Sequence, residues 1–231
     1  MSRPVAARAP HVYPQPNPHL RRSGIAIALL FLATAAAAIG AGAVLAPVFD
    51  GDLPRIAAAR PALATGAALW TVNNVGFVFI ALFAWPVLHP VAPFAARAYL
   101  TTRILEAGVM MTGVMALVAI PALAAAGEIG GVALLHALAD VTLDAGMLPL
   151  LGFSGLFLTG PLLRHRLVPG WLAAIGFAAY TLVIAAGFLS WGGWTRIGPG
   201  ETGFLLVAPV ALWEIVLMPA WLLWKGFAAP A

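Results

Sequence analysis

The sequence contains no cysteine and few charged residues. The lack of cysteine excludes disulfides, thiolate nucleophiles and Cys-ligated metals. Only 9% of the residues are charged and 62% are hydrophobic, whereas soluble domains typically carry about 25% charged residues. A chain of 231 residues cannot bury that much apolar surface in a core of its own. We therefore expect the lipid bilayer to be the main solvent and partner of this protein.

Several sequence motifs of catalysis and nucleotide binding are also missing. There is no P-loop, no H-E-x-x-H, no G-x-S-x-G and no dinucleotide-binding fingerprint. The chain shows no convincing internal repeat, so an inverted-repeat transporter is not indicated. The formal charge is +4, but most Lys and Arg residues flank apolar segments. Membrane topology explains that distribution better than nucleic-acid binding does, so we expect no nucleic-acid partner.

The dominant feature that is present is a series of long apolar segments. A helix that crosses a hydrocarbon core of about 30 Å needs about 20 such residues. The sequence therefore predicts an all-α polytopic membrane protein, with six transmembrane helices in one bundle over residues 23–227. The expected helices are Ser23–Val48, Pro61–Leu88, Phe94–Ile120, Val132–Leu163, Val168–Trp191 and Thr202–Trp224.

Prolines and glycines set the expected limits of these helices. Asp52 and Pro54 indicate a loop after the first helix, and Pro121 is expected to end the third. The fourth apolar segment would span roughly 48 Å as a straight helix, which is too long for one crossing. It must tilt steeply, begin outside the hydrocarbon, or break near Pro149.

Basic residues indicate how the chain is oriented. Residues 1–22 are polar, basic and rich in proline, so we expect a disordered cytoplasmic tail. Counting along the six helices places most of the cations at the same membrane face as this tail. By the positive-inside rule, both termini should be cytoplasmic. The cations on this face are Arg3, Arg8, Arg21, Arg22, Arg97, Arg164, Arg166 and Lys225, and those on the opposite face are Arg55, Arg60 and Arg196.

Five ionisable residues lie inside the apolar segments: Arg103, Glu106, Asp140, Asp144 and Glu214. A charge at the centre of a bilayer costs at least about 2.5–3.5 kcal/mol, so such residues usually face the interior of a bundle and serve a function there. They are the best functional candidates in the sequence.

Arg103 and Glu106 are three residues apart and share one face of the third helix. Glu214 lies about 16 Å from the cytoplasmic end of the sixth helix, near the midplane. A guanidinium can bridge two carboxylates, so we predict that Arg103 pairs with Glu106, Glu214 or both. Two interpretations stay open. The cluster is either a structural link between helices, with Arg103 partly extended toward the cytoplasm, or a site for an anion, a lipid headgroup or a proton-responsive gate.

His136, Asp140 and Asp144 recur every four residues and form one stripe on the fourth helix. One nitrogen and two carboxylates could hold a divalent metal. However, three ligands on one stripe do not close a tetrahedral site, so we expect no bound metal. The stripe is otherwise a wet interfacial face or part of a substrate or proton path. Asn73 and Asn74 lie at a similar depth and are expected to line the same cavity or to bond neighbouring helices.

Three stretches of this chain form a recognisable pattern. They are Pro86–Leu88 with Arg97–Tyr99 and Thr102–Ala107, then Arg166–Ala173, and finally Trp213–Ile215 with Trp221–Phe227. Over about Ser23–Phe227 the chain thereby resembles one known family, the bacterial six-helix membrane proteins grouped as domain-of-unknown-function family 4386. The resemblance implies a plasma-membrane location and a core built around Arg103 and Glu106, and it implies no activity.

These observations leave three hypotheses of different classes. The first is a protein without a cofactor that binds or translocates a small or lipidic ligand at Arg103, Glu106 and Glu214, with Asn73, Asn74, Asp140 and Asp144 as further lining residues. The second is a metal-dependent membrane enzyme that uses His136, Asp140 and Asp144. The third is a non-catalytic partner subunit or membrane anchor. The sequence favours a non-enzymatic role and indicates neither the ligand nor the oligomeric state.

Overall fold

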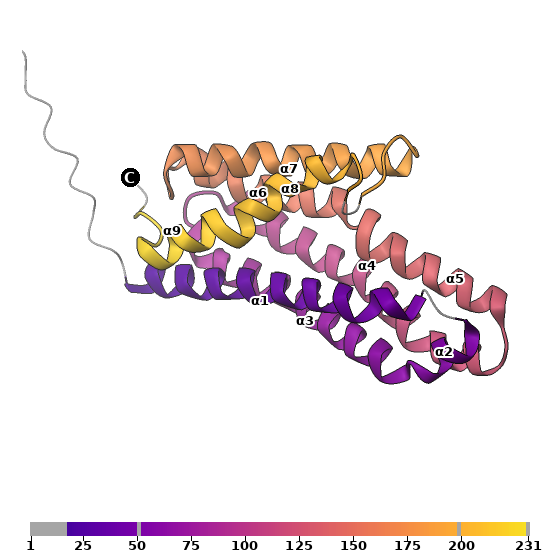
Figure 1. Cartoon of the computed structure of the whole chain (residues 1–231). Coiled ribbons are helices and arrows are strands. Elements are labelled where there is room, and N and C mark those ends of the chain that lie inside the picture. Colours follow the sequence, from indigo (N-terminus) through magenta and orange to yellow (C-terminus); the bar gives the residue numbers. More distant parts are fainter. Residues whose placement is uncertain (1–17, 50–51, 198–199, 230–231) are drawn as a thin grey trace, which may run out of the picture.

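The chain is described by a computed structural model that covers residues 18–49, 52–197 and 200–229, with the side chains of Asp144 and Ala145 outside this description. Within these residues every regular element is a helix, and six helical segments are long and apolar enough to cross a membrane (Figure 1). The predicted six-helix, all-α membrane fold is therefore confirmed. The elements are α1 (Pro18–Phe49), α2 (Leu53–Ala58), α3 (Arg60–Leu88), α4 (Pro93–Ala125), α5 (Ile129–Asp140), the π-helical turn η1 (Val141–Ala145), α6 (Leu148–Arg164), α7 (Gly170–Trp191), α8 (Phe204–Leu212), the π-helical turn η2 (Trp213–Leu217) and α9 (Met218–Trp224).

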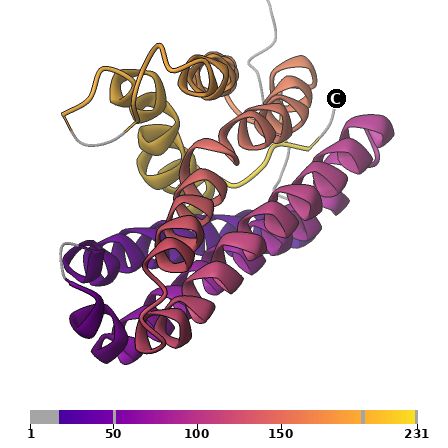
Figure 2. The same cartoon turned by 90° about the vertical axis from the view of Figure 1, so that its right-hand side faces the viewer.

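The helices form two groups that α4 joins. In the first group α1 packs on α3, α3 on α4, and α4 on α5; in the second, α6 packs on α7 and α7 on α8. Helix α4 also packs on α6, and α9 packs on α1. The two groups meet at the end of the bundle that carries Pro18 and Lys225, here called the terminal end. They diverge toward the opposite, distal end, which carries α2 (Figures 1 and 2).

Two buried cores follow from this arrangement. The larger core joins both groups in the terminal half, through Phe31 of α1, Tyr99 of α4, Tyr180 of α7 and Trp213 of η2. The smaller core lies within the first group, in the distal half, and includes Leu117 of α4. Among the described residues, the distal half therefore has no buried core that holds the second group to the first.

Helix limits near the first loop differ from the sequence prediction. Helix α1 begins at Pro18, so residues 18–22 are helical, and residues 1–17 of the predicted tail lie outside the described residues. The loop expected at Asp52 and Pro54 is instead the start of α2. The Asp52 carboxylate accepts a hydrogen bond from the backbone N–H of Arg55 at 3.2 Å. A capping carboxylate followed by proline in the first turn starts a helix.

The prediction that Pro121 ends its helix was wrong. Helix α4 continues to Ala125, with Pro121 buried inside it. Proline removes one backbone hydrogen bond, a loss that membrane helices tolerate because neighbouring helices hold the chain in place. Ile120 and Ala124 lie in the smaller core on either side of Pro121, and this packing keeps the helix continuous.

Two of the six membrane spans are interrupted by π-helical turns. In the fourth span, Gly146 N–H donates to the carbonyl of Val141 in the wide hydrogen-bonded ring that defines a π-turn. A new helix, α6, then starts at Leu148 with Pro149 in its first turn. The structure thus shows a break near Pro149, one of the three alternatives. The π-turn at Trp213–Leu217 of the last span was not predicted.

Candidate functional site

The candidate site is built around Arg103, whose side chain is completely buried between the two helix groups. Its Nη1 atom donates to both carboxylate oxygens of Glu106, at 3.1 and 3.0 Å. Its Nη2 atom lies 3.6 Å from Oε1 of Glu214 on η2. The structure therefore brings together all three residues of the predicted cluster. Because Arg103 is 0% exposed, it does not extend to the headgroups at the terminal end.

Aromatic side chains surround the guanidinium. The Arg103 Cζ atom lies 4.5 Å from the ring centre of Phe77 on α3 and 5.5 Å from that of Tyr99 on α4. A cation over an aromatic face in a dry site gains about 2 kcal/mol. The cluster thus holds its cation by two kinds of interaction, with carboxylates and with rings.

The last span is tied into the site by two further bonds. The hydroxyl of Tyr180 on α7 donates to Glu214 Oε1 at 2.5 Å. The indole N–H of Trp213 donates to the backbone carbonyl of Leu172 on α7 at 2.8 Å, and its ring meets that of Tyr180 edge to face. Glu214 therefore contacts α4 and α7 at once.

Three residues of this site, Phe77, Tyr99 and Tyr180, were not predicted from the sequence. Phe77 carries no signal that separates it from other apolar residues. The two tyrosines do carry one, since the chain has only three tyrosines and these two lie within spans. A tyrosine inside a membrane needs a partner for its hydroxyl, which points to a polar cluster.

Several polar atoms of the cluster have no hydrogen-bond partner. Within the described residues, these are Nε and Nη2 of Arg103 and the hydroxyl of Tyr99, all fully buried. Buried polar groups are bonded in about 90% or more of cases, so each exception calls for a physical reason. Within the described structure, the cluster therefore contains buried donors without a hydrogen bond, although Nη2 of Arg103 also lies 3.6 Å from Glu214.

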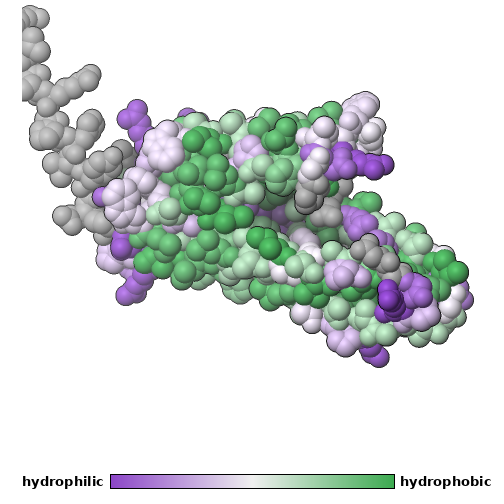
Figure 3. Space-filling view, in the orientation of Figure 1, coloured by the Kyte–Doolittle hydropathy of each residue, from purple (hydrophilic) through white to green (hydrophobic). Residues whose placement is uncertain are grey.

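The sixth span leaves one side of the cluster less covered. Helix α9 packs on α1, whereas α8, beyond η2, packs on α7. Figure 3 shows a hollow with hydrophilic surface between α1 and the last span, on the face seen in Figure 1. Glu214 lies on η2, where the span changes its neighbour, and its side chain is 13% exposed. Of the three charged residues in the cluster, Glu214 is thus the one that is partly exposed.

Asn73 and Asn74 join helices rather than lining a shared cavity. Asn73 Nδ2 donates to the carbonyl of Thr34 on α1 at 3.0 Å, and Asn74 Nδ2 contacts the Met111 sulfur on α4 at 3.6 Å. In the described structure neither residue is among those that line the distal cavity at Asp140. Interhelical bonding is the common role of asparagine in a membrane span.

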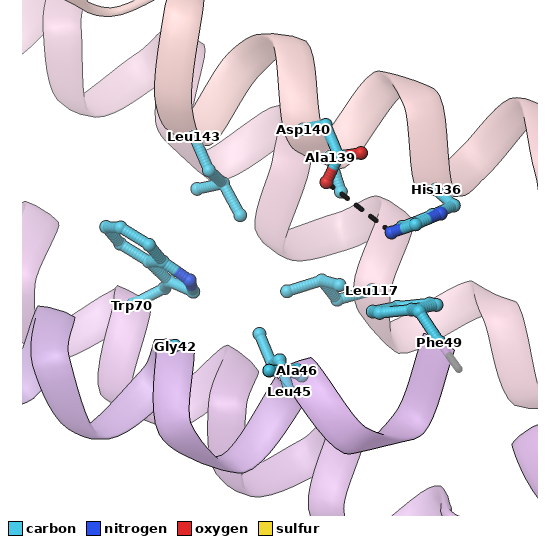
Figure 4. Close-up of a pocket in the computed structure, with 10 residues that line it drawn as sticks. All are labelled: Gly42, Leu45, Ala46, Phe49, Trp70, Leu117, His136, Ala139, Asp140 and Leu143. Carbon is cyan, nitrogen blue, oxygen red and sulfur yellow. Dashed lines mark ion pairs between the residues drawn. The ribbon is translucent and has the colours of Figure 1, made fainter. Parts of the chain in front are cut away.

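The predicted stripe on the fourth span is only partly described. His136 Nε2 lies 3.5 Å from Asp140 Oδ1, and the imidazole stacks on Phe49 of α1 with 3.8 Å between ring centres. Asp144 lies in η1, and its side chain is outside the described residues. Among the described side chains, no three His, Asp or Glu residues gather as a metal site would require. His136 and Asp140 instead line a cavity (Figure 4).

Tyr180→Phe should lower the unfolding free energy by about 1.5–3 kcal/mol, the usual worth of a hydrogen bond to a charged group. Tyr99→Phe is the matched control, because the Tyr99 hydroxyl has no partner within the described structure. Thermal unfolding in one detergent compares the two. A larger loss for Tyr99→Phe would contradict the roles assigned to the two hydroxyls.

Comparisons with known proteins give one result. No curated protein and no solved structure matches this chain. The family model described as a domain of unknown function (DUF4386) matches residues 26–226, a range that includes all six spans apart from the first turns of α1. It also includes Arg103, Glu106, Tyr180 and Glu214, and the chain belongs to this family.

Proposed function

We propose that this protein is a multi-pass membrane protein that binds a small or lipidic ligand at the cluster of Arg103, Glu106 and Glu214. One observation carries this proposal: within the described structure, Arg103 is fully buried and its Nε and Nη2 atoms make no hydrogen bond, and the neighbouring Tyr99 hydroxyl makes none either. Leaving buried polar groups unbonded costs about 1–3 kcal/mol each. A ligand that brings an acceptor oxygen to these donors would recover that cost.

The last span supports this proposal through its irregular backbone and loose packing. π-helical turns inside helices occur frequently at functional sites, and η2 carries Glu214. Each span contains a stretch of 18 strongly apolar residues. In the last span 28% of the residues in this stretch are buried, against 39–50% in the other five spans. A ligand could therefore approach Glu214 laterally, through the hollow between α1 and the last span.

We further place the protein in a bacterial plasma membrane with both termini cytoplasmic. Among the described residues, the terminal end carries basic side chains without any acidic ones, whereas the distal end carries both signs. Cytoplasmic surfaces are the ones enriched in Lys and Arg. The charged residues of the terminal end are Arg21, Arg22, Arg97, Arg164, Arg166 and Lys225, and those of the distal end are Asp52, Arg55, Arg60, Glu128, Arg196 and Glu201.

Reporter fusions test this orientation. Green fluorescent protein joined ahead of Met1 or after Ala231 should fluoresce, because it folds on the cytoplasmic side. Alkaline phosphatase joined at Trp194, in the distal loop after α7, should be active. An inactive phosphatase at Trp194 together with an active one after Ala231 would reverse the topology.

Native mass spectrometry from a gentle detergent tests the binding site. The wild-type protein should retain a non-covalent adduct, and the mass of the adduct should separate a lipid from a smaller molecule. Arg103→Lys should reduce its occupancy about tenfold or more, since an ammonium cannot reproduce the planar set of guanidinium donors. Arg97→Lys is the matched control, because Arg97 lies exposed on the same helix. Equal occupancy in both variants would remove the cluster as the binding site.

A further inference from the structure

A separate cavity of about 310 Å³ lies in the distal half of the molecule. It opens between α1 and α5, with α3 and α4 behind it (Figure 4). Leu117 of α4 lines it, 14 positions after Arg103, which corresponds to about 21 Å along the helix. The cavity is therefore distinct from the Arg103 cluster. Its lining residues are Gly42, Leu45, Ala46, Phe49, Trp70, Leu117, His136, Ala139, Asp140 and Leu143.

Within the described residues, Asp140 is the one carboxylate that lines the cavity. The described lining includes neither arginine nor lysine. The distance of 3.5 Å between His136 Nε2 and Asp140 Oδ1 exceeds the usual hydrogen-bond range of about 2.7–3.2 Å. His136 thus holds the carboxylate loosely, and 61% of the Asp140 side chain is exposed. The site has the charge to attract a cation.

Apart from His136 and Asp140, the residues that line the cavity are glycine or apolar, so the cavity also suits an apolar group attached to the cation. Leu45, Leu117 and Leu143 approach the open space from three sides in Figure 4, and the rings of Phe49 and Trp70 stand at its two ends. Aromatic faces attract ammonium groups, most strongly when water is excluded. The volume is at the lower end of the range of about 300–1,000 Å³ for ligand sites, so the ligand is small.

We propose that this cavity binds an amphiphilic amine, with the ammonium group at Asp140 and the apolar body between the leucines. The indole nitrogen of Trp70 faces the open space in Figure 4 and offers a donor to an acceptor on the far end of the ligand. The stack of Phe49 on His136, with 14° between the ring planes, closes the distal end and keeps His136 beside the carboxylate. This site requires no ligand at the Arg103 cluster.

Isothermal titration of the full-length protein in a neutral detergent tests the proposal with benzyltrimethylammonium, which joins an aromatic ring to a quaternary ammonium. Wild-type protein should bind one molecule saturably, and benzenesulfonate, an anion with the same ring, should not bind. Asp140→Asn should weaken the binding at least tenfold. Glu201→Gln, which removes one negative charge from an exposed distal position, should leave it unchanged. Equal weakening by both variants would show diffuse attraction to the distal end and overturn the site.

A second variant tests the cavity itself. Ala46→Phe should fill the space without altering any charge, and it should abolish binding while the melting temperature stays near that of the wild type. Retained affinity in Ala46→Phe would overturn the proposal. Arg103→Lys should bind the probe as wild type does, which separates this site from the cluster.

An ammonium group can come from a lipid headgroup or from a soluble amine. Titrations in nanodiscs that contain the same fraction of phosphatidylglycerol, mixed either with phosphatidylethanolamine or with an uncharged glycolipid, distinguish the two sources at equal surface charge. A lower apparent affinity in the bilayer with phosphatidylethanolamine would show that the lipid ammonium competes for the cavity. Equal affinities would assign the cavity to a soluble amine. Absence of saturable binding in both bilayers would exclude the site.

Discussion

Arg103→Ala should lower the unfolding free energy by about 3–5 kcal/mol, the cost of leaving a buried charge without its partner. The substitution removes the cation that lies between Glu106 and Glu214. Both carboxylates would then remain in a low-dielectric environment with little compensation. Thermal unfolding in a mild detergent should show the loss as a sharp fall of the melting temperature.

Double variants show which carboxylate depends on Arg103. Arg103→Ala with Glu106→Gln should recover more stability than Arg103→Ala with Glu214→Gln. The reason is that Glu106 receives two hydrogen bonds from Arg103, whereas Glu214 lies 3.6 Å away and also bonds Tyr180. Coupled neighbours typically deviate from additivity by about 0.5–3 kcal/mol. If neither double variant is more stable than Arg103→Ala alone, the three residues do not act as one cluster.

Gly155→Ala should destabilise the site through Tyr180, the residue of α7 that bonds Glu214. A methyl group at Gly155 of α6 would overlap the ring of Tyr180, which is fully buried and cannot move aside. Overpacking of a buried site costs about 1–3 kcal/mol and sometimes more, and here the displaced ring also carries the hydroxyl that holds Glu214. We expect a loss at the upper end of that range, measured as a lower melting temperature.

Gly160→Ala on the same helix is the matched control for this steric effect. The nearest atom that its methyl group would meet is 4.0 Å away, on the ring of Phe177. Alanine is favoured over glycine inside a helix by about 1 kcal/mol, so this variant should be as stable as the wild type or slightly more so. Equal destabilisation of the two variants would mean that α6 and α7 do not pack as described.

The spans and the Arg103–Glu106 pair could be predicted because both depend on local sequence. Hydropathy over about 20 residues identifies a span, and a separation of three residues places two side chains on one helix face. Glu214 could be assigned to the same cluster only through its depth in the membrane. No local pattern, however, marks Phe77 or Gly155, whose roles depend on helices that are distant in the sequence.

Backbone irregularities were the least predictable part of the fold. Pro121 was expected to end a helix, yet α4 continues because the packing of Ile120 and Ala124 outweighs one lost backbone bond. The π-turn at η2 has no proline or glycine among its residues Trp213–Leu217, but Pro219 follows it in the first turn of α9 and lacks the N–H that would bond the Ile215 carbonyl. The bond from Trp213 to the Leu172 carbonyl of α7 is a tertiary contact that the sequence of the span itself does not indicate.

The spacing of Arg103 and Glu106 also matters for how the chain enters the membrane during synthesis. Each charge alone would oppose insertion of α4 by about 2.5–3.5 kcal/mol. Because the two side chains pair within one helix turn, α4 can partition into lipid as a nearly neutral segment before α6 and the last span have been made. Glu214 lies in the last span and reaches Arg103 only after the other five spans have been made. A nascent chain that has not reached Glu214 would hold the Arg103 guanidinium with only one of its two carboxylate partners.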